Sequence, residues 1–346
     1  MLSRRALLSA AAGGGLALAL GRRGWAALPE PPEAAVEPAL PIIDCHHHLW
    51  DVSPFDGTRY LEAELLRDLA AGHNIRATVY IEAHSRYRAD GPEEMRPVGE
   101  TEFANGVAER HRDRRVCAGI VAHADLLLGD AVEPVLIAHR EAAPARLRGI
   151  RDRIASRAAR GDFENQKQIL QPAFRDGLRL LARYGLSFEA FAYHHHLGDV
   201  AATARACPDT QFVLNHLGGP LRLGPYAGRT NEIYAVWKQG IRAVAEQPNV
   251  VVKLGGIGMA TAGFAWEQGP HLPGSDELVA VTRPWYLHAI DCFGPGRCLF
   301  ESNFPPDALS SSYVTLWNAH KKLSAGFSAA ERAAMFHDNA RLVYRL

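Results

Sequence analysis

Short apolar, β-branched runs recur along the chain, and each is followed by a polar turn and a stretch with helical spacing. Runs that are apolar throughout, rather than alternating with polar residues, are typical of strands buried on both faces. Strands that alternate with helices predict parallel βαβ units. Eight candidate strands are found in this way, at residues 42–46, 77–83, 116–123, 147–151, 187–193, 211–216, 250–254 and 298–303.

Eight such units in about 300 residues predict an α/β protein with the (β/α)8 TIM-barrel fold. An open doubly wound sheet is the alternative, but no Gly-rich fingerprint follows the first strand. We expect the long segments 88–101 and 221–234 to form a lid or a specificity pocket. Residues 328–331, Ser-Ala-Ala-Glu, form a capping box that predicts a closing helix through Leu346.

The N-terminus predicts an export signal. Arg4 and Arg5 precede an Ala/Gly/Leu run that reaches about residue 20, as in a secretory signal. The arginine pair and the weak hydrophobicity of the run are typical of a twin-arginine signal. A membrane anchor is disfavoured because the run is short and residues 13–15 are all Gly. We expect cleavage after Ala26, transient contact with the twin-arginine export machinery, no stable membrane insertion, and a periplasmic mature protein.

The chain is thus divided into a signal peptide at 1–26, a linker at 27–41 and a single barrel domain at 42–346. The linker is rich in Pro, Glu and Ala and shows no periodicity, which is typical of an extended connection.

The amino-acid composition and charge limit the classes of partner that the protein is expected to bind. With 47% hydrophobic and 22% charged residues, the chain is neither disordered nor fibrous. The full chain is formally neutral, and removal of the signal, which carries four Arg and no acid, leaves a charge of −4. No basic stripe suggests binding to nucleic acid, so a small-molecule substrate is the expected partner. Five cysteines without a CxxC spacing predict no disulfide framework, although a single Cys292–Cys298 bridge stays open.

Histidines stand at the end of the first predicted strand, in the sequence DCHHHLW at residues 44–50. Because strand side chains alternate, His46 and His48 point to one side and His47 to the other. Two imidazoles two residues apart at the mouth of a barrel can share one divalent metal. At the end of the sixth strand, His216 precedes a Gly-Gly-Pro turn and is either a third ligand or a polarising group.

A second histidine cluster, Tyr193 to His196, ends the fifth strand, and we expect Tyr193 or His194 to face the pocket and contact substrate. Glu82, at the end of the second strand, is either a buried paired carboxylate or a catalytic acid.

Basic residues stand on two of the predicted strands. Arg148 and Arg151 bracket the fourth strand, where guanidinium groups can hold a substrate carboxylate or form ion pairs within the barrel. Lys253 ends the seventh strand and is expected at the same end of the barrel, as a substrate-binding residue or a partner of Glu82.

The motifs DCHHHLW, LRGIR, LNHLGGP, VKLGGIG and FESNFPPD, in this order and spacing, resemble those of the amidohydrolase superfamily. More narrowly, they resemble its branch (amidohydrolase-related family 2) that contains 2-pyrone-4,6-dicarboxylate lactonase and sugar-acid lactonases. The resemblance covers about residues 42–346. It implies the barrel fold, the first-strand pair His46 and His48, and the sixth-strand His216, and it maps the fourth-strand arginines onto Arg148 and Arg151.

One residue departs from the family pattern. Relatives usually carry an aspartate in the eighth-strand motif, where it serves as general base, but this chain has Asn303. An amide cannot accept the proton of a water nucleophile. Either Asp307, Glu82 or a histidine takes over as base, or the reaction differs.

The sequence therefore predicts an enzyme that hydrolyses a lactone or related cyclic ester of a small organic acid. One divalent metal, zinc or manganese, would be held by His46, His48 and His216, although the branch also includes metal-independent members. Two alternatives stay open: a decarboxylase or hydratase of an aromatic-derived acid on the same barrel, and an inactive barrel that only binds a ligand.

Overall fold

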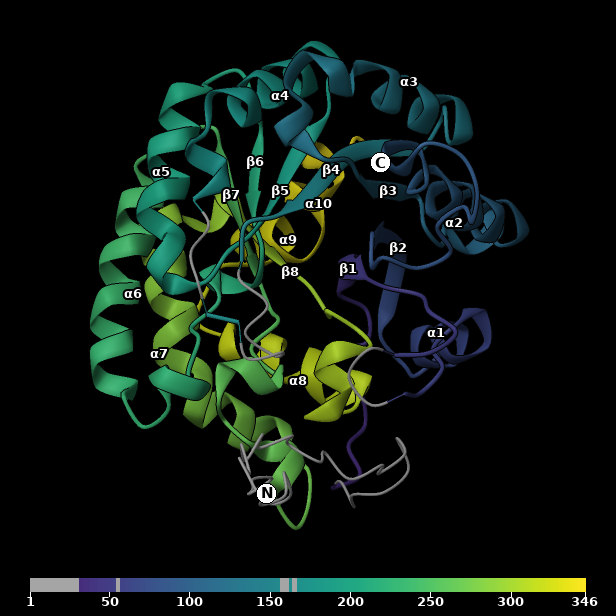
Figure 1. Cartoon of the computed structure of the whole chain (residues 1–346). Coiled ribbons are helices and arrows are strands. Elements are labelled where there is room, and N and C mark those ends of the chain that lie inside the picture. Colours follow the sequence, from purple (N-terminus) through teal and green to yellow (C-terminus); the bar gives the residue numbers. More distant parts are fainter. Residues whose placement is uncertain (1–30, 54–56, 156–161, 164–166) are drawn as a thin grey trace, which may run out of the picture.

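The computed structural model describes residues 31–53, 57–155, 162–163 and 167–346, so the predicted signal peptide lies outside the described residues. Its eight strands are parallel and adjacent in chain order, with helices around them (Figure 1). This arrangement is the predicted (β/α)8 barrel. The strands are β1 (Pro41–His47), β2 (Asn74–Ile81), β3 (Gly119–His123), β4 (Leu147–Arg153), β5 (Ser187–Phe191), β6 (Phe212–Leu214), β7 (Val250–Leu254) and β8 (Cys298–Phe300).

The helices that cover the barrel are α1 (Glu62–Leu69), α2 (Val98–Arg110), α3 (Glu133–Ala142), α4 (Pro172–Arg183), α5 (Leu197–Ala206), α6 (Thr230–Ala245), α7 (Ser275–Phe293) and α8 (Tyr313–Leu323). The predicted closing helix is present in three consecutive parts, α9 (Ala329–Ala333), a π-helical turn (Ala334–Asp338) and α10 (Asn339–Val343). Its predicted capping box is formed: Ser328 N–H donates to Glu331 at 2.8 Å and Ser328 Oγ accepts from Glu331 N–H at 3.3 Å.

Two apolar clusters explain why these strands form a barrel. The larger one lies between the strands and the surrounding helices. The smaller one contains strand side chains such as Ile43, Val79, Val213 and Leu299, together with Tyr344 from the C-terminal segment. Strands buried on both faces explain the continuous apolar runs in the sequence.

Some local predictions were wrong. Residues 116–118 precede β3 rather than belonging to it, and both predicted loops contain the start of a helix, at Val98 of α2 and Thr230 of α6. The cysteines are all free, so no Cys292–Cys298 bridge forms. None of the helices in the described part of the chain has the length and hydrophobicity that a membrane span requires.

The segment after β8 closes the barrel against β1. Asn303 N–H donates to the His46 carbonyl at 2.9 Å, and His48 N–H donates to the Phe304 carbonyl at 2.8 Å. The buried carboxylate of Asp44 accepts hydrogen bonds from Ser302 N–H at 3.0 Å, Ser302 Oγ at 2.7 Å and Tyr313 Oη at 3.0 Å. Asp44 therefore joins β1 to the chain that follows β8.

Replacement of Asp44 by alanine should destabilise the barrel. Asp44→Ala leaves Ser302 N–H and the Tyr313 hydroxyl buried without their acceptor, and Ser302 Oγ keeps only its 3.3 Å contact with the His46 carbonyl. We therefore expect a loss of about 3 kcal/mol in the free energy of unfolding. Urea unfolding followed by circular dichroism measures this loss. Asp276→Ala is the control, because that side chain is 88% exposed, and its midpoint should stay near the wild-type value. An unchanged midpoint for Asp44→Ala would contradict this account of closure.

Candidate active site

Three buried imidazoles meet at the C-terminal ends of the strands. The Nε2 atoms of His46 and His48 are 3.2 Å apart, and the ring centroids of His46 and His216 are 4.6 Å apart. His47 points to the other side, where its Nε2 lies 2.9 Å from Thr78 Oγ1, as strand alternation requires. Burial lowers the pKa of His46, His48 and His216 well below the usual value. The three rings are therefore neutral at pH 7 and can act as ligands through a nitrogen lone pair.

Glu301, the residue after β8, contacts two of these rings. Its Oε1 lies 2.7 Å from His216 Nδ1 and its Oε2 lies 2.8 Å from His46 Nδ1. Oε2 is not aligned for a hydrogen bond to that ring, and it has no such partner elsewhere among the described residues. Burial raises the pKa of Glu301 to about 8, while Lys253 lowers it. Glu301 was not predicted as a functional residue, although an acid directly after a barrel strand is a signal that could have identified it.

His46 can carry its proton on either nitrogen. His48 Nδ1 donates to the Ile81 carbonyl at 2.8 Å, so in the neutral ring His48 Nε2 carries no proton and offers a lone pair. If His46 carries its proton on Nδ1, beside Glu301, the Nε2 atoms of His46 and His48 both have lone pairs that face each other. A cation that binds both nitrogens removes the repulsion between these lone pairs. If the proton is on Nε2, His46 donates to His48 and its Nδ1 accepts from Lys253 Nζ at 3.2 Å. The first form is suited to binding a metal.

The structure fits a divalent metal here. The ligand atoms of His46, His216 and Glu301 all lie within 4.8 Å of one another. The 3.2 Å separation of the two Nε2 atoms also agrees with two imidazoles on one tetrahedral zinc, for which bonds of about 2.0–2.1 Å imply a spacing slightly above 3 Å. Neutral imidazole nitrogens are donors that zinc prefers, and a carboxylate against the Nδ1 atoms of His46 and His216 is the usual outer partner of metal-bound histidines.

Arg151 and Glu82 form a buried ion pair beside these histidines. Arg151 Nε donates to Glu82 Oε1 at 2.6 Å, and Arg151 Nη1 lies 3.4 Å from His46 Nε2. Burial alone would raise the pKa of Glu82, but Arg151, His84 and His123 outweigh it and hold the pKa well below its usual range. Glu82 is therefore ionised, and Arg151 lies close enough to His46 to contact a bound substrate.

Lys253 is deeper in the barrel than predicted. Its side chain is fully buried, and Nζ lies 2.9 Å from Glu189 Oε2 rather than near Glu82. Glu189 also accepts hydrogen bonds from Asn215 Nδ2 and from the Tyr344 hydroxyl. Lys253 is therefore paired with Glu189, and its Nζ also contacts Nδ1 of the site residue His46. The expected pairing of Lys253 with Glu82 is therefore wrong, and the expectation that Lys253 binds substrate stays a prediction.

Asn303 and Asp307 contact each other. Asn303 Nδ2 donates to Asp307 Oδ1 at 2.7 Å, and Gly258 N–H donates to Asp307 Oδ2 at 3.1 Å. Asn303 Oδ1 is buried and has no hydrogen-bond partner among the described residues. Burial raises the pKa of Asp307 to about 8. Asp307 therefore orients the side-chain amide of Asn303, and Asn303 Oδ1 can accept a hydrogen bond from a ligand.

The structure does not bring the other predicted residues to this cluster. Arg148 lies at the start of β4, where it donates to the carbonyls of Leu147 and Ala145 at 3.0 and 2.7 Å. Its prediction as a site residue is therefore corrected: it is three residues before Arg151, and strand alternation sends the two side chains to opposite sides.

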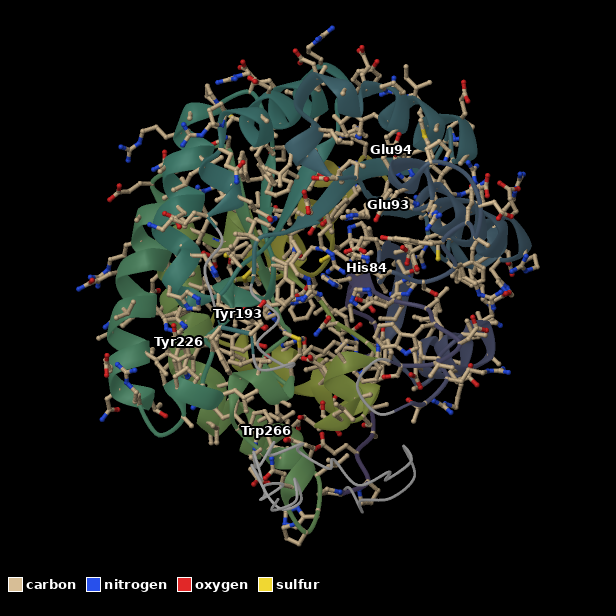
Figure 2. All side chains as sticks on the ribbon, in the orientation of Figure 1. His84, Glu93, Glu94, Tyr193, Tyr226 and Trp266 are labelled. Atoms are coloured by element: carbon tan, nitrogen blue, oxygen red, sulfur yellow. The ribbon has the colours of Figure 1, made fainter. Side chains whose placement is uncertain are left out.

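Tyr193 and His194 belong to a separate group of rings and apolar side chains. Tyr193 is buried with Leu221, and Tyr226 packs against them; Figure 2 shows Tyr193 and Tyr226 close together, apart from His84. His194 Nδ1 accepts from Leu221 N–H at 3.3 Å, and its ring meets Tyr226 edge-on. Phe191 connects this group to the site, because its ring centroid lies 5.3 Å from that of His216.

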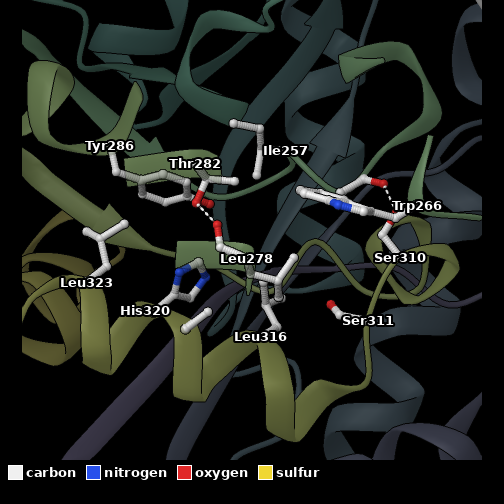
Figure 3. A pocket seen from close by; sticks show the side chains of 12 residues that line it. Ile257, Trp266, Leu278, Thr282, Tyr286, Ser310, Ser311, Leu316, His320 and Leu323 are labelled. Carbon is white, nitrogen blue, oxygen red and sulfur yellow. Dashed lines mark hydrogen bonds between the residues drawn. The ribbon is translucent and has the colours of Figure 1, made fainter. Parts of the chain in front are cut away.

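A small cavity lies behind this site, between α7, α8 and the chain after β7 (Figure 3). Its volume is about 20 Å³ and its lining includes Tyr286, Leu316 and His320. This space suffices for about one water. The ring of His320 contacts the Glu301 carbonyl at 3.1 Å, so this region supports the backbone of Glu301 rather than holding a substrate.

Comparison with known families identifies the protein class that this barrel and histidine cluster define. The model of the amidohydrolase family matches residues 43–346. The chain belongs to the amidohydrolase family, which confirms the resemblance inferred from the sequence motifs.

Individual relatives cover nearly the same region. An uncharacterised protein of Sinorhizobium fredii, y4mH, is 33% identical over 89% of this chain and 99% of its own length. L-fucono-1,5-lactonase of Burkholderia multivorans is 26% identical over 88% of this chain and 96% of its own. A crystal structure of a Burkholderia multivorans amidohydrolase with bound zinc has a TM-score of 0.71 and 25% identity, covering 88% of this chain and 99% of that one.

Replacement of Glu301 by glutamine should weaken metal binding. Loss of the carboxylate removes the group that contacts Nδ1 of both His46 and His216, and changes next to metal-bound histidines typically cost 10–100-fold in affinity. Competition with a fluorescent zinc chelator measures the affinity. Glu331→Gln, at the capping box far along the chain, is the control and should bind as the wild type does. Equal affinities for Glu301→Gln and the wild type would show that Glu301 does not support a metal.

Proposed function

We propose that this amidohydrolase opens the ring of a lactone or related cyclic ester of a small organic acid. The observation that carries the proposal is the group of three neutral imidazoles with Glu301 beside them and Arg151 within 3.4 Å of His46. The similarity to L-fucono-1,5-lactonase over most of both chains supports it.

His46, His48 and His216 would hold the metal through their Nε2 atoms. In all three rings Nδ1 already contacts a protein group, namely Glu301, Lys253 or the Ile81 carbonyl, which leaves Nε2 as the nitrogen for a metal. When bound, zinc or manganese polarises a carbonyl oxygen and increases the acidity of a water molecule. Glu301 keeps two of the rings oriented by contacting their Nδ1 atoms.

The remaining residues bind and orient the reactants. Arg151 would hold the carbonyl or a carboxylate of the substrate, and Asn303 Oδ1 would accept a hydrogen bond from the water. Asp307 contacts none of the three histidines in the described residues, so we assign transient proton acceptance to Glu82, the ionised carboxylate beside Arg151, whose low pKa lets it release the proton again readily. The water oxygen adds to the carbonyl carbon, the ring C–O bond breaks, and the proton passes to the leaving alkoxide to give a hydroxy acid.

Decarboxylation of an aromatic-derived acid is the second candidate. Asn303 favours it, because loss of CO2 requires no water nucleophile and hence no aspartate at this position. A 5-carboxyvanillate decarboxylase of Novosphingobium aromaticivorans, crystallised with manganese, shares the fold at a TM-score of 0.57 and 12% identity.

A panel of sugar-acid lactones and pyrone carboxylates tests the main proposal, with ring-opened acid measured by titration and CO2 by gas analysis. We expect acid without CO2. The His46→Ala/His48→Ala double variant should lower turnover by at least about 10²-fold, since it removes both imidazoles of the first strand. His337→Ala, in the π-helical turn, is the control and should keep full activity. Unchanged turnover in the double variant, or CO2 as the product, would refute the lactonase assignment.

We also propose that the protein is exported to the periplasm through the twin-arginine pathway, on the basis of residues 1–26. Cell fractionation and N-terminal sequencing test this proposal. We expect a periplasmic protein that begins after Ala26, and an Arg4→Lys/Arg5→Lys variant that stays in the cytoplasm. A cytoplasmic wild-type protein that keeps its N-terminus would contradict it.

A further inference from the structure

A groove of about 350 Å³ lies at the end of the barrel opposite to the histidines. It is formed where β3 and β4 begin, next to α2 and the C-terminal segment, which Figure 1 shows beside each other. Five arginines line it, namely Arg112, Arg115, Arg146, Arg148 and Arg345, with Ala108, Val116, Ala118, Ala145 and Leu346 between them. The sequence does not show this basic surface, because three separate segments contribute to it.

The positive charge of the groove is only partly balanced. Glu109 pairs with two of the arginines, Arg112 and Arg146, the latter at 2.5 Å. In the part of the chain that the structure describes, no acidic residue forms an ion pair with Arg115, Arg148 or Arg345. Three of the five guanidinium groups that line the groove therefore have no carboxylate partner among the described residues.

Arg148 lines the groove and is half-buried. Its Nη1 and Nη2 donate only to backbone carbonyls, and its Nε is buried with no hydrogen-bond partner among the described residues. Burial lowers the pKa of Arg148, and the charges of Arg345 and Arg146 lower it further. An arginine stays protonated under such conditions, so an anion that enters the groove gains the positive charge of Arg148.

We propose that this groove binds a small phosphate-bearing ligand, at a site separate from the active site. Guanidinium groups match the oxygens of a phosphate in pairs, and one phosphate group offers a double negative charge and three acceptor oxygens to arginines that converge from different segments. The volume suits a compact ligand. This inference does not depend on the proposed lactonase activity.

Isothermal titration of the full-length protein with pyrophosphate, at constant ionic strength in chloride, tests the proposal. We expect saturable binding that is at least tenfold weaker in the Arg148→Gln/Arg345→Gln double variant. The single variant Arg345→Gln should also weaken binding, and because Arg345 is exposed it should fold as the wild type does. Arg229→Gln, an exposed arginine that pairs with Glu232 on α6, is the control and should bind pyrophosphate normally.

Three results would overturn the proposal. They are no saturable binding of pyrophosphate by the wild type, equal binding by the wild type and both groove variants, or equal binding of citrate, which would show that the groove has no preference for phosphate. Loss of binding together with full lactone hydrolysis in the groove variants would support a separate site and leave the proposed function intact.

Discussion

Hydrogen bonds between the end of β1 and the chain after β8 hold the candidate active site together. Asp44 receives both donors of Ser302, and the backbone of Asn303 reaches the carbonyl of His46. Glu301 lies between β8 and Ser302, so the same contacts place its carboxylate against His46 and His216. The three histidines stand at or just after the ends of β1 and β6, and only the closed barrel brings them to one point.

Burial sets the chemistry of this region. It keeps the imidazoles neutral, which is the form that binds a metal. Two buried cations nearby are each matched by a carboxylate, Lys253 by Glu189 and Arg151 by Glu82, since an unpaired buried charge is strongly destabilising. Lys253 lies on the inner side of His46 and Arg151 on the outer side, so the two nitrogens of one ring face different environments.

The sequence predicted the barrel because buried parallel strands leave continuous apolar runs, and it predicted the His46 and His48 pair because strand side chains alternate. Residues whose roles depend on partners far along the chain were harder to place. Lys253 was expected to bind substrate or to pair with Glu82, but its partner is Glu189, which stands inside an apolar run of β5. Glu301, two residues before Asn303, was not predicted as a site residue. The arginine groove combines three distant segments, which no local pattern can reveal.

In the proposed function, His46, His48 and His216 would hold a divalent metal through Nε2, with Glu301 behind the rings. A crystal structure of the protein grown with zinc, with anomalous diffraction data collected at the zinc edge, tests it most directly. We predict a single strong anomalous peak in contact with Nε2 of His46 and of His48, on the side of Arg151. A peak on the Nδ1 side between His46 and Glu301, or no peak at these histidines, would contradict it.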